Sequence, residues 1–572
     1  MTPERLLCRV VAGRHAIQIR FRGHPLAATV GSLLLATAAV AGAQPVPFTP
    51  PTIGSANTAV ADPPVARPHS TPCKVDLLTA QQFADFNPKF FNYAPPADCP
   101  GPWQKVVLEA DYSVEAGRQF DRTATLWIGG GNIYFGTTAE PSHAVGRAWH
   151  IERDLTDYSA LLAQVSTGRA ELGNLVDSTY TSSLWGTAAL YFYPVEQDRD
   201  DASAPKVPDQ VLTLSAGATG GTVALFSPSD QLSATFTMPT NIERAMLDVV
   251  LQHQGANDEF WYTCVPAALS ASLQSCAGTA FREGELTIDG QPAGVVPIRP
   301  WIFTGGIDPL LWRPIPSPQA LNFEAYRVDI TPFAANLSDG QPHTFAITVF
   351  NDSQYFQTTA NLLLWLDHGS TQVTGGVTKN TIGAPAPVVT PNLTTDAVGT
   401  VSGTVDTSSA REFVLAGRVV TSHGPVDTEI RQKIAFDNQQ QFIVPQTAIN
   451  YVQNITQSTE IRSTTVVRDV AGEHETVSNL SWPLVLDITV YPSGSFTTGV
   501  SQGYIKDIRS PDGNRFVSDS GQWGDTYPTG VGQAGQQRYF SRDGEDHCYS
   551  RELDAAGGVL TTIVDGKGCH AD

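Results

Sequence analysis

Apolar and polar residues alternate in short runs along most of the chain, and turn-forming residues separate these runs. From about residue 71 the clearest runs are VVLEADYSV (106–114), ATLWIGG (124–130), NIYFGTT (132–138) and ALYFYPV (189–195). Alternation of this kind is typical of β-strands with one buried face. Gly129 to Gly131 separates two of the runs and predicts a hairpin turn. The stretch DYSALLAQ (157–164) is the exception and predicts a short helix.

A second set of strand-like runs begins near residue 222 and closes with NLLLWLDHG (361–369). Within it, Phe345, Ile347 and Val349 alternate along HTFAITVFND, as the buried face of a strand does. Two successive sets of ~150 residues each predict two β-sandwiches of the jelly-roll kind, packed side by side. The chain is therefore predicted to be all-β.

The predicted domains follow these sets. The first jelly roll is expected over 71–220 and the second over 221–370. Residues 44–70 are rich in Pro and predict a linker or an extended arm. A Pro/Thr/Gly-rich seam, GAPAPVVTPNLTTDAVG (383–399), marks a boundary near the start of another strand-rich region. We therefore treat 371–572 as a C-terminal β-rich accessory region.

Composition agrees with this class and narrows the possible partners. The 572 residues include 49 Gly and 40 Pro, which suits many turns, and 41% are hydrophobic, which suffices for packed cores. The net charge is −21, and because the first 43 residues carry +4, the remainder carries −25. Such a surface repels nucleic acid and anionic lipid. We expect no nucleic-acid partner and a soluble monomer.

The N-terminus has the parts of an export signal. An Arg-rich region ends at Arg22, an apolar run follows over 26–40, and the small residues AGA occupy 41–43. The apolar run is short for a membrane span. We predict a signal peptide over 1–43 and a secreted or periplasmic protein with no membrane association after cleavage.

Removal of Cys8 with that segment leaves six cysteines, an even number that predicts three disulfides in an exported protein. Sequence proximity favours the pairs Cys73–Cys99, Cys264–Cys276 and Cys548–Cys569 among the 15 possible connectivities. None of the cysteines has the CxxC spacing of a zinc site. We therefore predict no metal site.

The sequence argues against two common hydrolase motifs. Residues 499–503, GVSQG, match a nucleophile elbow by letter, but that motif needs a following helix and YIKDIRSPDG predicts strand and turn. No HExxH metalloprotease motif occurs.

Carboxylic acids beside aromatic residues form the more informative pattern. They recur in QFDRTATLW, in TTAEP, in GANDEFWYTC, in RPWIFTGGIDPLLWRP and in NLLLWLDHG. Some members have ordinary explanations: Trp127 and Trp365 are predicted core residues, and Asp308 precedes a Pro and can shape a turn. Asp258 and Glu259 lie beside Phe, Trp and Tyr, where desolvation raises carboxyl pKa values. Aromatic faces with acids and amides also suit a sugar-binding cleft. The residues alone thus predict an exported, carbohydrate-directed β-sandwich protein.

The chain resembles the peptide-N4-(N-acetyl-β-glucosaminyl)asparagine amidase A family at these residues. The similar segments are FFNYAPP, CPGPWQKVVLE, GRQFDRTATLWIGGGNIYFGTTAEP, WHIERDLTDYSALL, NDEFWY, FTGGIDPLLWRP and NLLLWLDHG, in order from about 80 to 370. It is more distantly similar to peptide-N-glycosidase F. The resemblance implies hydrolysis of the amide between Asn and the innermost N-acetylglucosamine of N-glycosylated peptides and glycoproteins, without a metal or organic cofactor.

The resemblance also implies roles for individual residues. Asp121 matches the catalytic acid, and Glu259 is the best match for the second acid. A third acid is expected after the LL segment, where Asp177 is the candidate. The chemistry is consistent with Asp121 as the base that activates water and with Arg122 as its orienter or as an oxyanion donor. Because Asp121 and Glu259 belong to different sandwiches, we predict a cleft along their interface.

The other polar and aromatic members of the clusters are predicted to bind substrate. Trp261, Trp301 and Trp312 are candidates for stacking on the two core sugars. The polar candidates are Glu140, Asn257, Asp258, Asp308 and Arg313. Two alternatives remain open at this stage: a lectin-like protein that binds glycans without cleaving them, and a glycosidase that cuts within the chitobiose core.

Overall fold

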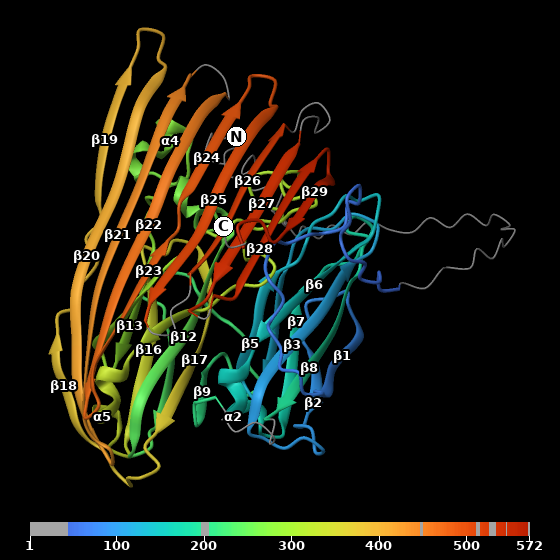
Figure 1. Cartoon of the computed structure of the whole chain (residues 1–572). Coiled ribbons are helices and arrows are strands. Elements are labelled where there is room, and N and C mark those ends of the chain that lie inside the picture. Colours follow the sequence, from blue (N-terminus) through green and yellow to red (C-terminus); the bar gives the residue numbers. More distant parts are fainter. Residues whose placement is uncertain are drawn as a thin grey trace, which may run out of the picture.

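Antiparallel β-sheets dominate the described part of the chain (Figure 1). The computed structural model describes residues 44–195, 205–446, 450–510, 515–525, 533–544 and 546–569. The predicted signal peptide, residues 1–43, lies outside the described residues. The predicted all-β class is confirmed. Among the described residues, no helix is long and apolar enough to cross a lipid bilayer.

The first unit is a pair of four-stranded sheets. One has the order β1 (Cys73–Phe83), β8 (Leu184–Pro194), β3 (Trp103–Val114), β6 (Arg147–Asp154), and the other β2 (Lys89–Tyr93), β7 (Ser166–Leu172), β4 (Thr123–Ile128), β5 (Gly131–Thr137). β4 and β5 are buried at nearly every position. Tyr134 belongs to the core of this unit, whereas its neighbour Phe135 stacks on Phe323 of the second unit. β5 therefore lies between two cores.

Two details predicted from the pattern are confirmed in this unit. Helical turns occupy Thr156–Tyr158 and α2 (Ser159–Leu162), within the predicted helical stretch. The β4–β5 hairpin turns at Gly129 and Gly130, whose φ angles of 55° and 85° favour glycine.

The second unit is also a pair of sheets. One contains β10 (Val223–Leu225), β17 (Tyr355–Leu366), β12 (Ile242–Gln254) and β15 (Tyr326–Asp329), with β9 (Gln210–Leu214) added beside β17; the other contains β11 (Leu232–Thr237), β16 (Pro342–Phe350), β13 (Glu283–Ile288) and β14 (Gln291–Pro297). The predicted inward residues Phe345, Ile347 and Val349 are fully buried. Three short helices, α3 (Gly255–Asp258), α4 (Ala267–Leu273) and α5 (Ala334–Leu337), interrupt the connections.

The third unit, in its described part, is one 12-stranded antiparallel sheet that curves along the second unit (Figure 1). Its main order is β18 (Thr374–Asn380), β20 (Val401–Thr421), β21 (Gly424–Val444), β22 (Tyr451–Asp469), β23 (Gly472–Ser481), β25 (Phe496–Arg509), β26 (Arg515–Asp525), β27 (Ala534–Arg542), β28 (Cys548–Ala556), β29 (Val559–Asp565). β19 (Val388–Thr395) pairs with β20, and β24 (Leu484–Val490) pairs with β22 and β25. Val405, Leu415 and Phe436 of this sheet share one core with the second unit.

Residues 44–70 form an extended arm without regular structure. The arm is nevertheless tied to both ends of the molecule. Val65 N–H donates to Glu152 of the first unit at 2.7 Å, and Gly54 N–H donates to the Leu560 carbonyl of the large sheet at 2.7 Å. The arm thus connects the first and third units.

Two of the three predicted disulfides form, Cys264–Cys276 and Cys548–Cys569. The predicted Cys73–Cys99 bond is corrected, because both residues are free thiols in the structure. The Cys99 Sγ–H donates instead to the Phe192 carbonyl at 3.7 Å, and Cys73 stands opposite Phe192 in the β1–β8 pairing.

Candidate functional site

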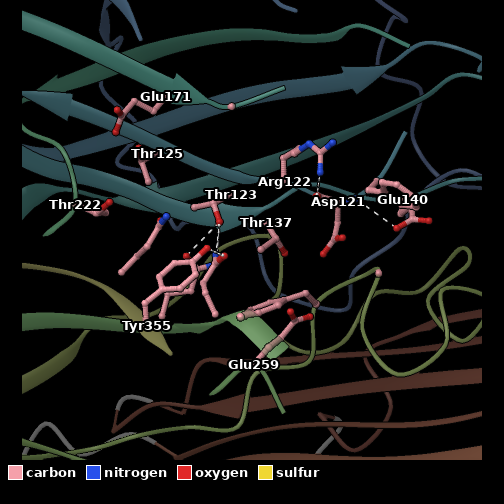
Figure 2. A pocket seen from close by; sticks show the side chains of 18 of the residues that line it. Asp121, Arg122, Thr123, Thr125, Thr137, Glu140, Glu171, Thr222, Glu259 and Tyr355 are labelled. Atoms are coloured by element: carbon pink, nitrogen blue, oxygen red, sulfur yellow. Dashed lines mark hydrogen bonds between the residues drawn. The ribbon is translucent and has the colours of Figure 1, made fainter. Parts of the chain in front are cut away.

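A cavity of about 500 Å³ opens where the first two units meet (Figure 2). Asp121, Arg122 and Glu140 come from the first unit, and Glu259 and Tyr355 face them from the second. The lining residues are Phe86, Phe120, Asp121, Arg122, Thr123, Thr125, Thr137, Glu140, Glu171, Gly173, Thr222, Gln252, Gln254, Gly255, Glu259, Phe260, Phe303, Gly305, Pro309, Tyr355 and Gln357.

Asp121 and Glu140 are brought together by the β4–β5 hairpin. The hairpin pairs Thr123 with Thr137, and the Arg122 and Thr138 backbones continue the pairing one residue further. Asp121 and Glu140 therefore lie beyond the open end of the hairpin, where Asp121 N–H donates to Glu140 Oε2 at 3.3 Å. The sequence pattern that predicts the hairpin therefore also predicts that Asp121 and Glu140 lie close together.

Glu140 is a buried acid between two opposing charges. Burial raises the pKa of Glu140 to about 8, and the negative charge of Asp121 acts in the same direction. Arg313 opposes both effects, with its Nη2 3.7 Å from Glu140 Oε1 and its Nε donating to the Glu140 carbonyl at 2.8 Å. Glu140 therefore keeps its proton to a higher pH than an ordinary glutamic acid does.

Glu259 approaches the same space from the second unit. It follows the single turn of α3, which is inserted directly after the long strand β12. Burial raises the pKa of Glu259 to about 8, and the charge of Asp121 raises it further. Two acids whose pKa values are raised, Glu140 and Glu259, therefore face Asp121.

Arg122 has a partly satisfied guanidinium group. Its Nη2 donates to Gln119 Oε1 at 2.9 Å and its Nη1 donates to the Asp121 carbonyl at 3.3 Å. Burial lowers the pKa of Arg122 from its ordinary value, and the charge of Asp121 opposes this effect. The group lines the cavity as a fixed positive charge beside Asp121.

A network of amides and hydroxyls forms part of the cavity wall. The Nε2 groups of Gln252 and Gln254 donate to Thr123 Oγ1 at 3.0 and 2.9 Å, and Tyr355 Oη–H donates to Gln254 Oε1 at 2.9 Å. Thr123 belongs to the first unit, whereas the other three residues belong to the second. The network therefore joins the two units and presents neutral hydrogen-bonding groups to a ligand.

Gly305 closes the cavity against the acid pair. A Cβ atom at this position would lie 2.7 Å from Glu140 Oε2 and nearer still to Asp121 Oδ1. Only a residue without a side chain lets the loop approach both carboxyl groups this closely.

The tryptophans predicted to stack on sugars are placed differently. Trp261 is fully buried and contacts Phe436, and Trp301 stacks on Phe323 with ring centroids 4.4 Å apart. Trp312 is 4% exposed and its Nε1–H donates to the Gly306 carbonyl. The structure corrects this prediction, because protein neighbours cover these rings and none of them lines the cavity.

Other aromatic side chains line the cavity in place of the three tryptophans. Phe86, Phe120 and Tyr355 line the cavity, and Phe86 is 68% exposed. Trp127 and Trp365 are buried, which confirms that they are core residues.

Three polar residues predicted to bind substrate lie outside the cavity lining, and the carboxylates of two of them, Asp258 and Asp308, hold loops. Asp258 is fully buried, pairs with the Arg282 Nε at 2.9 Å and accepts the Ser353 N–H at 3.0 Å. The Asn257 N–H donates to Gln354 Oε1 at 3.2 Å. The Asp308 carboxylate accepts the Leu310 N–H at 2.9 Å, as the turn interpretation implied. None of the three lines the cavity, and Arg313 reaches it through Glu140.

Asp177 lies in an exposed turn, where its carboxylate accepts the N–H groups of Thr179 and Tyr180 at 2.7 and 2.8 Å. It is not among the residues that line the cavity. The acid that does line it after the LL segment is Glu171 on β7, directly opposite Thr125 in the β4–β7 pairing. Opposite residues share one face of a sheet, so both point into the cavity.

Glu171 belongs to none of the motifs that the sequence displays. Alternation in STGRAEL places Glu171 on the face opposite Leu172. This alternation shows which face of the strand carries Glu171, but it does not identify the surface that this face meets.

One group of possible metal ligands occurs among the described residues, namely Glu243, Asp367 and His423, whose ligand atoms lie within 4.8 Å of one another. The Asp367 carboxylate already accepts the Ser422 hydroxyl at 2.6 Å and the Gly369 N–H at 3.0 Å. None of the three acidic or imidazole groups lines the cavity.

The fold and the site together define the class: an all-β protein with carboxylic acids from two units in one cleft, an arrangement suited to acid–base hydrolysis. The family model for peptide N-acetyl-β-D-glucosaminyl asparaginase amidase A matches residues 63–382, and the chain belongs to this family. It is 30% identical over 569 residues to the peptide-N4-(N-acetyl-β-glucosaminyl)asparagine amidase A of Prunus dulcis, covering 92% of this chain and 95% of that protein.

Solved structures give a weaker likeness. PNGF-II aligns with 52% of this chain and 66% of its own length, at 11% identity and a TM-score of 0.37. PNGase F, a glycosylasparaginase from Flavobacterium meningosepticum, aligns with 51% of this chain and 96% of its own, at 11% identity and a TM-score of 0.34.

Proposed function

We propose that this protein hydrolyses the amide bond between an asparagine side chain and the innermost N-acetylglucosamine of N-glycosylated peptides and glycoproteins. The observation that carries the proposal is the meeting of Asp121 and Glu259, one acid from each unit, in a single cleft of a chain that belongs to the amidase A family.

Asp121 is assigned the role of general base. It deprotonates a water molecule that attacks the side-chain carbonyl carbon of the asparagine. Arg122, a fixed cation beside it, balances the negative charge of Asp121 and of the tetrahedral oxyanion. Glu140 and Glu259 are neutral acids next to Asp121, so they can donate hydrogen bonds without repelling it.

Glu259 is assigned the role of general acid. As the carbon–nitrogen bond breaks, the departing nitrogen takes the proton of Glu259, and the asparagine becomes an aspartate. The other product is a glycosylamine, which water converts to the free glycan and ammonia. The proton that Asp121 took from water then passes to Glu259 by way of solvent, so both acids return to their starting states, and the new carboxyl group of the peptide ionises.

The remaining lining suits the sugar and the peptide. Gln252, Gln254 and Thr123 offer neutral hydrogen-bonding groups to hydroxyl and N-acetyl groups. Tyr355 and Phe120 offer ring faces to the CH faces of sugars. The cavity volume of 500 Å³ lies within the range of about 300–1,000 Å³ that ligand pockets occupy.

Mass spectrometry of a denatured glycopeptide after incubation with the protein tests the reaction. Amide cleavage gives a peptide with Asp in place of Asn, heavier than the Asn peptide by about one mass unit because NH is replaced by O. In H₂¹⁸O the heavy oxygen enters that Asp. A peptide that keeps one N-acetylglucosamine would identify a glycosidase, and an unchanged glycopeptide that remains bound would identify a lectin; either result refutes the amidase.

We also propose that the protein acts as a monomer after export and binds no nucleic acid. The net charge of −21 supports the absence of nucleic-acid binding, and the N-terminal signal pattern supports export. Light scattering during gel filtration tests the oligomeric state, and cell fractionation tests export. A molar mass of a dimer throughout the elution peak would contradict the monomer, and retention in the cytoplasm would contradict export.

A further inference from the structure

Loop 303–317, FTGGIDPLLWRPIPS, is the least regular part of the catalytic cleft and contains no helix or strand. It nevertheless places Gly305 against the acid pair and Arg313 against Glu140. On this side, the Thr304 hydroxyl donates to the Thr138 carbonyl at 2.6 Å, and Arg313 Nε donates to the Glu140 carbonyl at 2.8 Å. Because the loop belongs to no sheet, contacts on its other side contribute to its position together with these bonds.

The other side of loop 303–317 is held by the large C-terminal sheet. Gln533 Nε2 donates to the Leu310 carbonyl at 2.6 Å. Gln537, on β27, makes a longer contact from its Nε2 to the Pro316 carbonyl at 3.4 Å. Ile315 completes this contact in an apolar cluster whose other members are Ala59, Ala61, Leu553, Ala555 and Leu560.

The N-terminal arm forms the third member of the contact. Ala59 N–H donates to the Pro314 carbonyl at 3.1 Å, and Ala61 N–H donates to Gln537 Oε1 at 2.6 Å. Gln537 is 1% exposed. Its amide therefore joins arm, sheet and loop at one buried point, where no solvent can replace a lost partner.

We propose that Gln537 is a positioning residue for catalysis: through Pro316 and the arm it sets loop 303–317, and through that loop the Arg313–Glu140 pair and the contact of Gly305 with Asp121. This inference rests on the proposed function. It assigns the C-terminal sheet and the arm a part in the reaction, although neither contributes a residue to the cavity lining.

The Gln537→Ala variant tests the proposal, and Gln536→Ala is its matched control. Gln536 is the same residue type on the same strand, but its side chain is exposed and bonds to Arg538. With glycopeptide as substrate and at a temperature where all variants are folded, we expect kcat of Gln537→Ala to fall about tenfold or more, because a misplacement of about 1 Å can cost ~100-fold. KM should change less than threefold, and Gln536→Ala should match the wild type.

A double-mutant cycle separates positioning from general destabilisation. If Gln537 acts through Arg313, Gln537→Ala should reduce kcat far less in an Arg313→Ala background than in the wild type. Equal losses in both backgrounds, or a lower melting temperature with unchanged kcat, would overturn the proposal.

Amide hydrogen exchange gives a reading that does not depend on activity. The N–H groups of Gly306, Asp308 and Leu311 are bonded within the loop and should exchange more slowly than open amides. Gln537→Ala should accelerate exchange over 303–317 at least about fivefold relative to Gln536→Ala. Unchanged exchange would refute the role of Gln537 in positioning loop 303–317. A wild type that releases no Asp peptide would refute the proposed function, and the exchange result would still decide whether Gln537 positions the loop.

Discussion

Replacement of Gly305 by Ala provides the sharpest test of the acid pair. The added Cβ would lie 2.7 Å from Glu140 Oε2 and 2.9 Å from Asp121 Cγ, whereas ordinary contact begins at 3.4 Å. Glu140 would have to retreat by about 0.7 Å and the Asp121 carboxylate by ~1 Å, because the methyl group cannot be compressed. Both obstructing groups are side-chain ends that can rotate away, so the fold should accommodate the change.

The reaction should not accommodate it. A displacement of about 1 Å at the general base costs on the order of 100-fold in kcat, equivalent to ~2.7 kcal/mol of barrier. We expect the melting temperature of Gly305→Ala to stay within about 3 °C of the wild type, because Glu140 and Asp121 line the cavity, where water can replace the contacts that the displaced carboxyl groups give up. The assay is release of the Asp peptide, with kcat and KM determined separately.

Gly306→Ala is the matched control. Its Cβ would meet the Phe303 carbonyl at 3.2 Å and Phe260 at 3.5 Å, contacts that require shifts of only a few tenths of an ångström, and it would touch neither acid. We expect kcat within about threefold of the wild type. Equal activity of the two variants, or a Gly305→Ala protein with more than a third of wild-type kcat, would refute the placement of the acids.

Four further predictions concern the acids and the aromatic residues. Glu259→Gln cannot donate a proton and should lose about 100-fold or more in kcat; retention of wild-type kcat would remove Glu259 from the mechanism. The folded pKa of Glu259, about 8, exceeds its ordinary value of 4.5, so its proton stabilises the fold at low pH and this contribution is lost as pH rises from 4.5 to 8. The melting temperature of Glu259→Gln should therefore decline less steeply than that of the wild type over that window. Glu171→Gln should raise KM for glycopeptide while an Asp177→Asn protein keeps wild-type KM, because Glu171 alone of the two lines the cavity; the reverse order would favour Asp177. Trp301→Ala should lower the free energy of unfolding by about 3–5 kcal/mol in denaturant titrations, as loss of a buried ring does; weaker glycan binding with unchanged stability would instead place its ring in the cleft.

Much of the fold follows from local pattern. Alternation over 343–352 and the glycines at 129–131 predict a buried strand face and a hairpin, and both form because strand periodicity and turn conformation depend on neighbouring residues. The same hairpin brings Asp121 near Glu140. The acids Asp121 and Glu259 were found through the chemistry of their neighbours and through the family resemblance.

The aromatic residues show where local pattern stops. Trp261, Trp301 and Trp312 have the composition of a sugar-binding surface, yet all three rings are buried, Trp261 against Phe436 and Trp301 against Phe323. Phe86 lines the cavity instead. A large apolar side chain reduces its exposure wherever it can, and only the packed structure says which rings have been covered.

By itself, the sequence determined an all-β protein with carboxylic acids beside aromatic residues and the motifs of one amidase family. Only the tertiary structure decided that Glu171 rather than Asp177 faces the cleft, and that loop 303–317 is held between the arm and the C-terminal sheet. Strand periodicity states which side chains share a face, but the identity of the opposing surface depends on contacts between residues hundreds of positions apart, such as Ala61 and Gln537.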